Sequence, residues 1–146
     1  QIAFNVIPQI DAFMDNDYTK EEMKMVWETR KILGDDTILV NPTAVRVPVF
    51  YGHGEAIHIE TRSPIDAQEV KALLAAAPGV KLYDDREEFP TQVCSASGND
   101  LTHVGRVRND ISHPNGINMW VVSDNIRKGA ATNSVQIAET LIKDFL

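Results

Sequence analysis

The order of strand-like and helix-like segments is the feature that most constrains the fold of this chain. Alternating or continuous runs of β-branched and apolar residues predict strands at 2–8, 37–40, 44–51, 56–61, 80–83, 103–111 and 117–123. Helical patterns cover 19–34, 64–76 and 125–144. Because several strands follow one another without a helix between them, we predict an α/β protein of the α+β type. Its sheet should be mixed and largely antiparallel, with the helices on one face.

Local signals at the ends of these segments sharpen the prediction. Thr19 is suited to cap the first helix, Gly34 to end it, and Asp124 to cap the last one. The residues expected to face the core from the first two helices are Met23, Val26, Trp27, Arg30, Val70, Leu73, Leu74 and Ala77. Glycines between the segments 44–51 and 56–61 predict that these two strands form a hairpin.

Composition bounds the class of protein. A chain of 146 residues fits one domain, 1–146, and its start at Gln1 rather than at methionine predicts a piece of a longer protein. The net charge of −7 and the pI near 5.0 argue against nucleic acid or an anionic membrane as a partner. Cys94 is the single cysteine, and no apolar run is long enough for a membrane helix. We therefore expect a soluble, cytoplasmic protein without a disulfide.

An arginine and a histidine lie seven residues apart in the segment VRVPVFYGHGE, 45–55. Arg46 in a β-branched run needs solvent or an anion, and its planar guanidinium suits a carboxylate or a phosphate. His53, between two glycines, could transfer a proton near neutral pH. On these residues alone, an arginine in water and a turn histidine are the better interpretation. If both serve one substrate, the strand must bend at its proline or glycines, because seven extended residues span roughly 23 Å.

Three longer motifs occur in a fixed order along the chain. They are TKEEMKMVWETRKILG at 19–34, VRVPVFYGHGE at 45–55 and VVSDNIRKGAATNSVQIAE at 121–139. Together they resemble the C-terminal part of aspartate-semialdehyde dehydrogenase, and the resemblance runs from the first residue to the last. It implies the catalytic and dimerisation domain of an enzyme with a glyceraldehyde-3-phosphate dehydrogenase-like fold. Such enzymes reduce L-4-aspartyl phosphate to L-aspartate 4-semialdehyde with NADPH, in the biosynthesis of threonine, of methionine and, through diaminopimelate, of lysine.

The resemblance also implies roles for four residues. His53 matches the family's acid–base histidine, and Arg46 matches the arginine that holds the substrate carboxylate through a bidentate pair. Glu21 matches a glutamate that meets the substrate amino group, and Lys24 matches the lysine of the phosphate site. By spacing alone, Glu21 and Lys24 could equally form an ordinary surface ion pair on one helix face.

The last helix carries the inference about the cofactor. In the family, the segment that matches about 124–146 packs on an N-terminal NADP-binding domain, and the position of Asn125 contacts NADP. Gly129 leaves little bulk on an early turn and would let a ligand or a second domain approach closely. An ordinary capped amphipathic helix is the alternative. No Gly-x-Gly-x-x-Gly motif occurs in the chain, so we expect NADP to bind mainly to a domain that this sequence lacks.

The remaining candidates have weaker patterns. The family's nucleophilic cysteine lies in an Asn-Cys pair, whereas Cys94 follows a valine, so we expect an inert packing residue. No metal site is predicted, because His53 and His58 would face opposite sides of a strand. Arg106 and Arg108 share a strand face and could bind an anion, although a solvated or interfacial face is more common.

Two functions are therefore expected as alternatives. The first is the catalytic and dimerisation part of an aspartate-semialdehyde dehydrogenase, a homodimer that binds aspartate semialdehyde and phosphate and is inactive in isolation. The second is a non-catalytic α/β dimerisation module. Retention of Glu21, Lys24, Arg46 and His53 together favours the first, because a module that only associates needs none of them.

Overall fold

The computed structural model describes all of residues 1–146. Contacts within the chain gather in two compact units, an N-terminal unit, Gln1–Pro48, and a C-terminal unit, Val49–Leu146. The expectation that residues 1–146 act as one domain stays a prediction. None of the helices combines the length and the apolar composition needed to span a bilayer.

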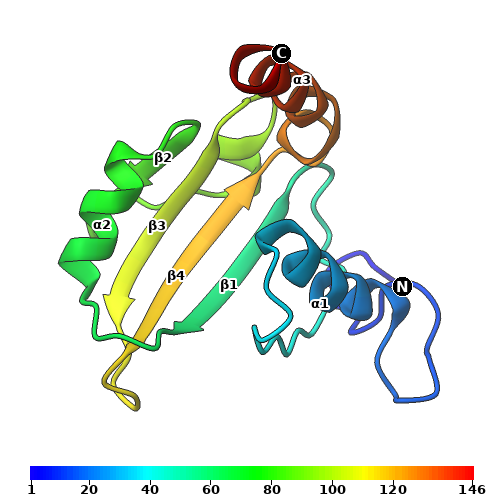
Figure 1. Ribbon diagram of the computed structural model, residues 1–146. Helices are drawn as coiled ribbons and strands as arrows, with labels where there is room; N and C mark the ends of the chain where they lie inside the picture. Colours follow the sequence, from blue (N-terminus) through cyan, green and yellow to red (C-terminus); the bar gives the residue numbers. More distant parts are fainter. The chain divides into compact units, whose positions relative to one another are not determined.

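The N-terminal unit contains one helix, α1, at Lys20–Leu33 (Figure 1). Thr19 caps it through a reciprocal pair of bonds. The Glu22 amide N–H donates to the Thr19 hydroxyl at 3.3 Å, and the Glu22 carboxylate accepts from the Thr19 N–H at 2.8 Å. Gly34 ends the helix with a φ of 65°, a left-handed conformation that favours glycine. The predicted start and end of this helix are confirmed.

The buried side of α1 differs from the predicted stripe. Val26 is buried as expected, and Glu22, one turn before it, is buried too. The prediction was wrong for Trp27, which is 47% exposed. Because bonds to backbone amides hold Glu22 inside, the buried side of the helix is centred one residue before the predicted one.

Three segments near the N-terminus were wrongly predicted as strands: 2–8, 37–40 and 44–51. They form no ladder and contain only an isolated antiparallel bridge between Ile7 and Arg46. The two residues exchange hydrogen bonds, with N–O distances of 3.0 Å and 2.9 Å. Prolines at 8, 42 and 48 explain the difference, because proline has no backbone donor for a ladder and fixes φ.

The C-terminal unit is built on a four-stranded sheet with the order β1-β4-β3-β2 (Figure 1). The strands are β1 (His53–Glu60), β2 (Val80–Tyr83), β3 (Thr102–Asn109) and β4 (Gly116–Ser123). β4 pairs antiparallel with β1 and with β3, whereas β2 pairs parallel with β3. The predicted mixed, largely antiparallel sheet is confirmed. The predicted hairpin before β1 is wrong, because β1 takes β4 as its partner along its whole length.

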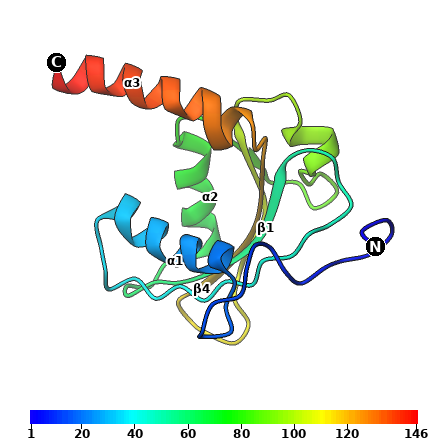
Figure 2. The same cartoon turned by 90° about the vertical axis from the view of Figure 1, so that its right-hand side faces the viewer.

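The helix α2 (Ala67–Ala76) covers one face of this sheet (Figure 2). The Asp66 carboxylate caps it by accepting hydrogen bonds from the next two free amides, so the helix begins three residues later than predicted. The core under α2 contains the buried residues Ala67, Val104, Val107 and Ile117. Val70 and Leu74 pack on this core as predicted, but the prediction was wrong for Leu73, which is 61% exposed.

The opposite face of the sheet is partly covered by the connection between β2 and β3. This connection includes a π-helical turn at Gln92–Ala96 that lies against β4 and β3 (Figure 2). Trp120 of β4 donates its indole N–H to the Pro90 carbonyl at 2.9 Å. A Cβ at Gly105 would lie 2.6 Å from the Pro90 ring, so only glycine fits under this connection.

An extra residue in β3 brings two arginines to one side of the sheet. Gly105 pairs with Trp120 and Arg108 pairs with Asn118, so three steps along β3 match two along β4. Arg106, the extra residue, adopts a left-handed φ of 58°. Arg106 and Arg108 therefore both line the open hollow beside Trp120, as the shared strand face predicted.

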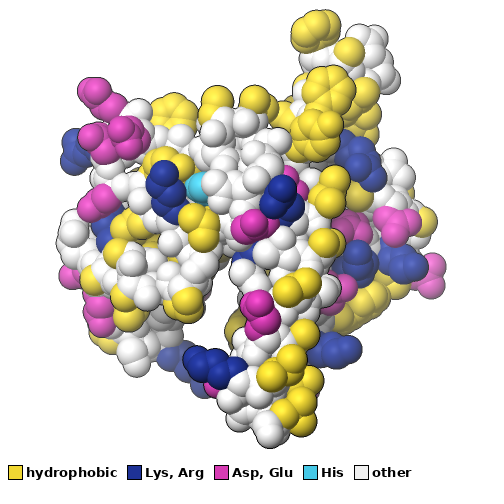
Figure 3. Space-filling model, turned by 90° about the horizontal axis from the view of Figure 1, so that it is seen from above, with side chains coloured by type: hydrophobic (Ala, Val, Ile, Leu, Met, Phe, Trp, Pro, Cys, Tyr) yellow, Lys and Arg dark blue, Asp and Glu magenta, His cyan; other side chains and the backbone are white.

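The chain ends in a π-helical turn, Arg127–Ala131, followed by the helix α3, Thr132–Phe145. The α-helix thus begins later than the predicted 125–144, because the chain first turns tightly after Asp124. No residue of α3 is buried. Its exposed apolar residues are Val135, Ile137, Leu141, Ile142 and Phe145, and hydrophobic side chains follow one another along α3 in Figure 3.

Candidate active site

The six residues predicted for the site are divided between the two units. Glu21, Lys24 and Arg46 belong to the N-terminal unit, and His53, Asn125 and Gly129 belong to the C-terminal unit. The convergence of all six on one substrate stays a prediction. Within each unit, however, the structure shows what holds each side chain and which groups it can offer to a ligand.

Glu21 and Lys24 form an ion pair on the first turns of α1. The Lys24 ammonium lies 3.1 Å from a carboxylate oxygen of Glu21, and both side chains remain accessible to solvent. The hydrogen bond that Lys24 donates to Glu21 raises the pKa of Lys24 above its ordinary value, and the charge of Glu21 adds to this effect. Lys24 is thus fully charged at neutral pH, and two of its three donors are free for an oxyanion.

Arg46 is fixed by its backbone and free at its side chain. The bridge to Ile7 engages both its N–H and its C=O. Its side chain is exposed and makes no hydrogen bond within the chain. A planar guanidinium on a fixed backbone, with its donors unoccupied, can bind a carboxylate by donating two parallel hydrogen bonds to it.

Glu22 joins α1 to the segment that carries Arg46, and the sequence interpretation missed this role. One carboxylate oxygen accepts from the Thr19 N–H, and the other accepts from the Ala44 N–H at 2.8 Å. These two bonds lower the pKa of Glu22. The Thr-x-x-Glu pattern at 19–22 gives a signal for the cap, but no local signal points to Ala44.

His53 is the first residue of β1 and lies between two glycines that are sterically required. Gly52 has a φ of 81°, and a Cβ there would lie 3.1 Å from the Ser123 carbonyl oxygen. A Cβ at Gly54 would lie 2.9 Å from the Trp120 ring. The His53 side chain is exposed and makes no hydrogen bond within the chain. Its ring nitrogens are therefore open to a ligand, as the flanking glycines predicted.

No straight strand joins Arg46 to His53. The chain bends at Pro48, at Phe50 and at Tyr51, and Gly52 then adopts its left-handed conformation. A bend at the proline or the glycines was predicted if the two residues serve one substrate; the chain bends at the proline, whereas Gly54 lies within β1. Whether the two side chains share a substrate stays a prediction.

Asn125 holds the backbone next to His53. Its side-chain oxygen accepts a hydrogen bond from the Gly52 N–H at 3.0 Å, although the two residues are 73 positions apart. Gly129 lies in the π-helical turn, where its N–H donates to the Asp124 carbonyl at 2.9 Å. Gly129 is exposed, and a Cβ there would make only an ordinary contact at 3.5 Å. Nothing inside the chain therefore requires a glycine at this position.

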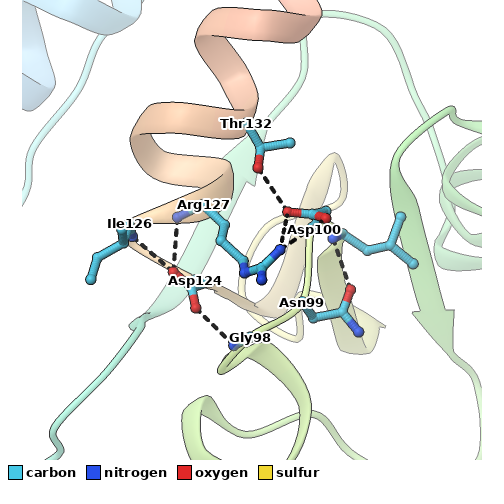
Figure 4. Close-up of polar contacts among 8 residues, drawn as sticks. Gly98, Asn99, Asp100, Asp124, Ile126, Arg127 and Thr132 are labelled. Carbon is cyan, nitrogen blue, oxygen red and sulfur yellow. Dashed lines mark hydrogen bonds and ion pairs between the residues drawn. The ribbon is translucent and has the colours of Figure 1, made fainter.

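Two carboxylates fix the start of the C-terminal segment (Figure 4). Asp124, only 6% exposed, accepts from the N–H groups of Ile126, Arg127 and Gly98 at 2.8, 2.9 and 2.8 Å. These bonds lower its pKa. The prediction that Asp124 caps the last helix was wrong: the N-cap of α3 is Ala131, without a side-chain bond, and Asp124 instead holds the turn before it.

The second carboxylate, Asp100, lies before β3 and binds the beginning of α3 (Figure 4). It accepts from the Thr132 hydroxyl at 2.7 Å and from the Arg127 guanidinium at 3.2 Å. The bond from Thr132 lowers the pKa of Asp100 most, and the bond from Arg127 lowers it further. No spacing in the sequence pointed to this pair of bonds.

The weaker candidates can be placed as well. Cys94 is exposed, unpaired and part of the π-helical turn on the sheet face, where only its backbone N–H is bonded, to Thr91. His58 pairs with Asp110 at 2.6 Å. No group of three or more His, Cys, Asp and Glu side chains is arranged to hold a metal ion.

Comparison with known proteins identifies close relatives. Residues 1–128 match the family described as semialdehyde dehydrogenase, dimerisation domain. Aspartate-semialdehyde dehydrogenase of Shewanella violacea is 70% identical over 145 residues, which are 99% of this chain and 43% of that protein. The chain thus spans less than half the length of this relative.

Solved structures agree with these matches. Aspartate-semialdehyde dehydrogenase II from Vibrio cholerae, in its complex with ASA, matches with a TM-score of 0.96 and 66% identity. The match covers 100% of this chain and 43% of that one. The Candida albicans enzyme with NADP matches with a TM-score of 0.77 and 27% identity, over 97% of this chain and 45% of that one.

Proposed function

We propose that this chain, which belongs to the family of semialdehyde dehydrogenase dimerisation domains, forms the acid–base and substrate-binding part of an aspartate-semialdehyde dehydrogenase. The observation that carries the proposal is the match over the whole chain to the Vibrio cholerae enzyme in its complex with ASA. At 66% identity the two chains share most of their side chains, which supports the same substrate class. Because the chain spans 43% of that protein, the remaining groups would come from residues outside it.

The proposed reaction is the reductive dephosphorylation of L-4-aspartyl phosphate to L-aspartate 4-semialdehyde. The bond from the acyl carbon to the phosphate oxygen breaks, the carbon gains a hydride, and inorganic phosphate leaves. NADPH would supply the hydride, and a nucleophilic cysteine outside this chain would hold the acyl carbon. The residues of this chain would bind and orient the substrate and move a proton.

Two cations of the N-terminal unit are proposed to bind the substrate anions. Arg46 would hold the α-carboxylate through two parallel bonds, which its fixed backbone and free guanidinium support. Lys24 would hold the phosphate, for which a compact ammonium with two free donors is suited. Glu21, which already accepts one bond from Lys24, would meet the substrate amino group.

His53 is proposed to move the proton. Its exposed ring has both nitrogens free within the chain, and an imidazole exchanges protons readily near neutral pH. In this role it would take the proton from the attacking thiol and return one to the oxygen of the reacting carbon. The required glycines on both sides keep its backbone close to Ser123 and Trp120.

Asn125 and Gly129 are proposed to face NADP, most of which would bind to the part of the enzyme outside this chain. The side-chain nitrogen of Asn125 makes no bond within the chain, so it can donate to a ligand. Gly129 is exposed and has no internal need to be glycine, which supports close approach of another group. The unburied apolar side of α3 supports packing of residues 124–146 on that missing part.

The quaternary structure and the compartment are proposed from the same family membership. The family is described as a dimerisation domain, and we propose that this chain forms a homodimer. A cytoplasmic location is supported by the exposed free thiol of Cys94, which persists in a reducing compartment. The second candidate, a dimerisation module without chemistry, is favoured only by the family description itself.

A complementation experiment tests the proposed activity. The chain is mixed with the separately expressed N-terminal part of the Vibrio cholerae enzyme, which lacks the matching 43%. Aspartate semialdehyde, phosphate and NADP are added, and the formation of NADPH in the reverse reaction is followed by its absorbance. We expect no activity from the chain alone and recovered activity in the mixture. His53→Ala should abolish the recovered activity, and Arg46→Ala should raise the KM for aspartate semialdehyde.

The controls separate catalysis from folding. Ile111→Ala changes a fully exposed residue in the turn after β3 and should leave the recovered activity unchanged. A mixture that remains inactive although both parts are folded would favour the dimerisation module. Activity of the chain alone would contradict the proposal and make Cys94 the candidate nucleophile.

A further inference from the structure

The hydrogen bond between Asn125 and Gly52 connects two parts of the C-terminal unit for which different roles are proposed. Asn125 was assigned to the cofactor, whereas Gly52 precedes the acid–base candidate His53. The Asn125 side-chain oxygen lies 3.0 Å from the Gly52 nitrogen. Because the backbone N–H can only donate, this contact must be made by the oxygen of the Asn125 amide, and its NH2 group is left free.

The Asn125 side chain is held firmly enough to impose a position on its partner. Asp124, the preceding residue, is buried and accepts three backbone N–H bonds, one from the loop at Gly98 and two from the turn that follows (Figure 4). On the other side, Arg127 is bound to Asp100. Asn125 therefore projects from a backbone that is fixed both before and after it.

A hydrogen bond at Gly52 can orient the backbone of His53, the next residue. With a φ of 81°, Gly52 adopts a conformation that only glycine takes readily. His53 then enters β1 opposite Ser123, two residues before Asn125. The bond from the Gly52 N–H to the Asn125 side chain lies just beyond the end of this ladder.

We infer that Asn125 is a positioning residue for His53, and that it acts through the Gly52 N–H. The inference rests on the proposed function, because it concerns how the acid–base histidine of that site is oriented. The oxygen of the amide orients the histidine segment, and the free NH2 group of the same side chain would donate to the cofactor. One side chain therefore links the occupancy of the cofactor site to the position of the proton-transfer group.

Substitutions that separate the two ends of the amide test this inference. Asn125→Ala removes both the acceptor for Gly52 and the donor for the cofactor. Asn125→Asp keeps an oxygen for Gly52 but removes the donor and adds a negative charge. Asn133→Ala, at the start of α3, is the matched control, because it removes the same side-chain amide from a position outside the proposed site.

The first readout is the Gly52 amide in the 146-residue chain, followed by NMR. In Asn125→Ala we expect hydrogen exchange at Gly52 to accelerate about tenfold, the effect of one lost hydrogen bond. The His53 ring resonances should shift in the same variant. Asn125→Asp and Asn133→Ala should retain the native exchange rate. Unchanged exchange at Gly52 in Asn125→Ala would overturn the inference, whatever the activity.

The second readout is steady-state kinetics in the complementation mixture. Positioning of His53 predicts that Asn125→Ala lowers kcat about tenfold and that Asn125→Asp restores it, while both variants raise the KM for NADP. The pH profile of kcat should change in Asn125→Ala and not in Asn125→Asp. A raised KM with unchanged kcat in both variants would make Asn125 a cofactor contact only and would overturn the inference.

The same experiment distinguishes failure of the proposed function from failure of the inference. An inactive wild-type mixture, or full activity in His53→Ala, would overturn the assignment of His53 and the proposed function with it. Loss of activity in His53→Ala together with native kcat in Asn125→Ala would leave the proposed function intact and overturn only the positioning role.

Discussion

Thr19 shows how one hydroxyl can decide where a helix begins. It is almost fully buried, it accepts from the Glu22 N–H, and its own N–H is bound by the Glu22 carboxylate. Both bonds satisfy donors that a helix start otherwise leaves unpaired. The same Glu22 carboxylate reaches Ala44, so the cap also anchors the segment that leads to Arg46.

Thr19→Ala should therefore lower the free energy of unfolding by about 1 kcal/mol, the usual cost of losing a helix cap. Thr19→Ser keeps the hydroxyl and should lose much less. Urea denaturation followed by circular dichroism measures both variants. Equal stability of the alanine and serine variants would contradict a capping role.

His103 predicts a pH dependence of stability. It is buried, its Nδ1 lies 3.2 Å from the Tyr83 hydroxyl, and its Nε2 has no partner. Burial lowers the pKa of His103, and the nearby charge of Lys81 lowers it further. The folded state thus prefers the neutral ring. The contribution of the neutral His103 ring to the stability of the folded state is fully present above the unfolded pKa of 6.5. It is lost as the pH falls from that value through the folded pKa.

We expect the urea concentration at the unfolding midpoint to decrease when the pH is lowered from about 7.5 to about 5.5, a range around the ordinary histidine pKa of about 6.5. His103→Phe should flatten this dependence, because phenylalanine fills the site without titrating. His113→Phe, in the β3–β4 turn, is the control and should keep the native slope. The same slope in all three proteins would exclude His103 as the source.

At the scale of elements, what the sequence predicts depends on how local the cause is. The start and end of α1 were predictable because Thr19 and Gly34 act within one turn of helix. β3 and β4 were predictable from apolar runs close together in the chain. The segments before His53 were not, because their apolar residues resemble strands while prolines and distant partners decide the pairing.

In the candidate site, too, features with a local cause were predictable and contacts between distant residues were not. The motifs that resemble a known family indicated Glu21, Lys24, Arg46 and His53. The bond from Gly52 to Asn125 joins residues 73 positions apart, and no periodicity in a single sequence records such a contact. Asp100 was missed for the same reason, since its partners Thr132 and Arg127 follow it by 32 and 27 positions.

The turn after β4 offers a prediction at this scale. Asp124→Ala should accelerate amide exchange at Gly98, Ile126 and Arg127, because all three donors lose their acceptor. Asp124→Asn can keep the two bonds of the turn through its oxygen, while its NH2 group cannot accept from Gly98. Fast exchange confined to Gly98 in Asp124→Asn would support this account, and uniform native exchange in Asp124→Ala would contradict it.

At the scale of the whole molecule, many apolar side chains remain exposed. They occur in both units, and in the C-terminal unit they gather on the connection before β3 and along α3. Monomeric proteins seldom leave such surfaces uncovered. We therefore expect the chain to self-associate at micromolar concentrations, and sedimentation velocity measures the stoichiometry.

Two substitutions locate the surface responsible. Ala56→Asp places a charge on the open face of the sheet beside Trp120, and Leu141→Asp places one on α3. If dimerisation uses the sheet, Ala56→Asp should give a monomer and Leu141→Asp a dimer. The reverse result would move the interface to α3.

The extra residue in β3 makes that strand tolerant of a change in length. With Arg106 counted, Val107 faces α2 and Arg108 faces the open side, opposite Asn118. Without it, Gly105 would be followed directly by Val107, and ordinary alternation would put both later residues on the same faces as before. The deletion would also relieve a left-handed arginine. A gene lacking this codon should therefore still encode the same sheet, with one arginine fewer on its open side.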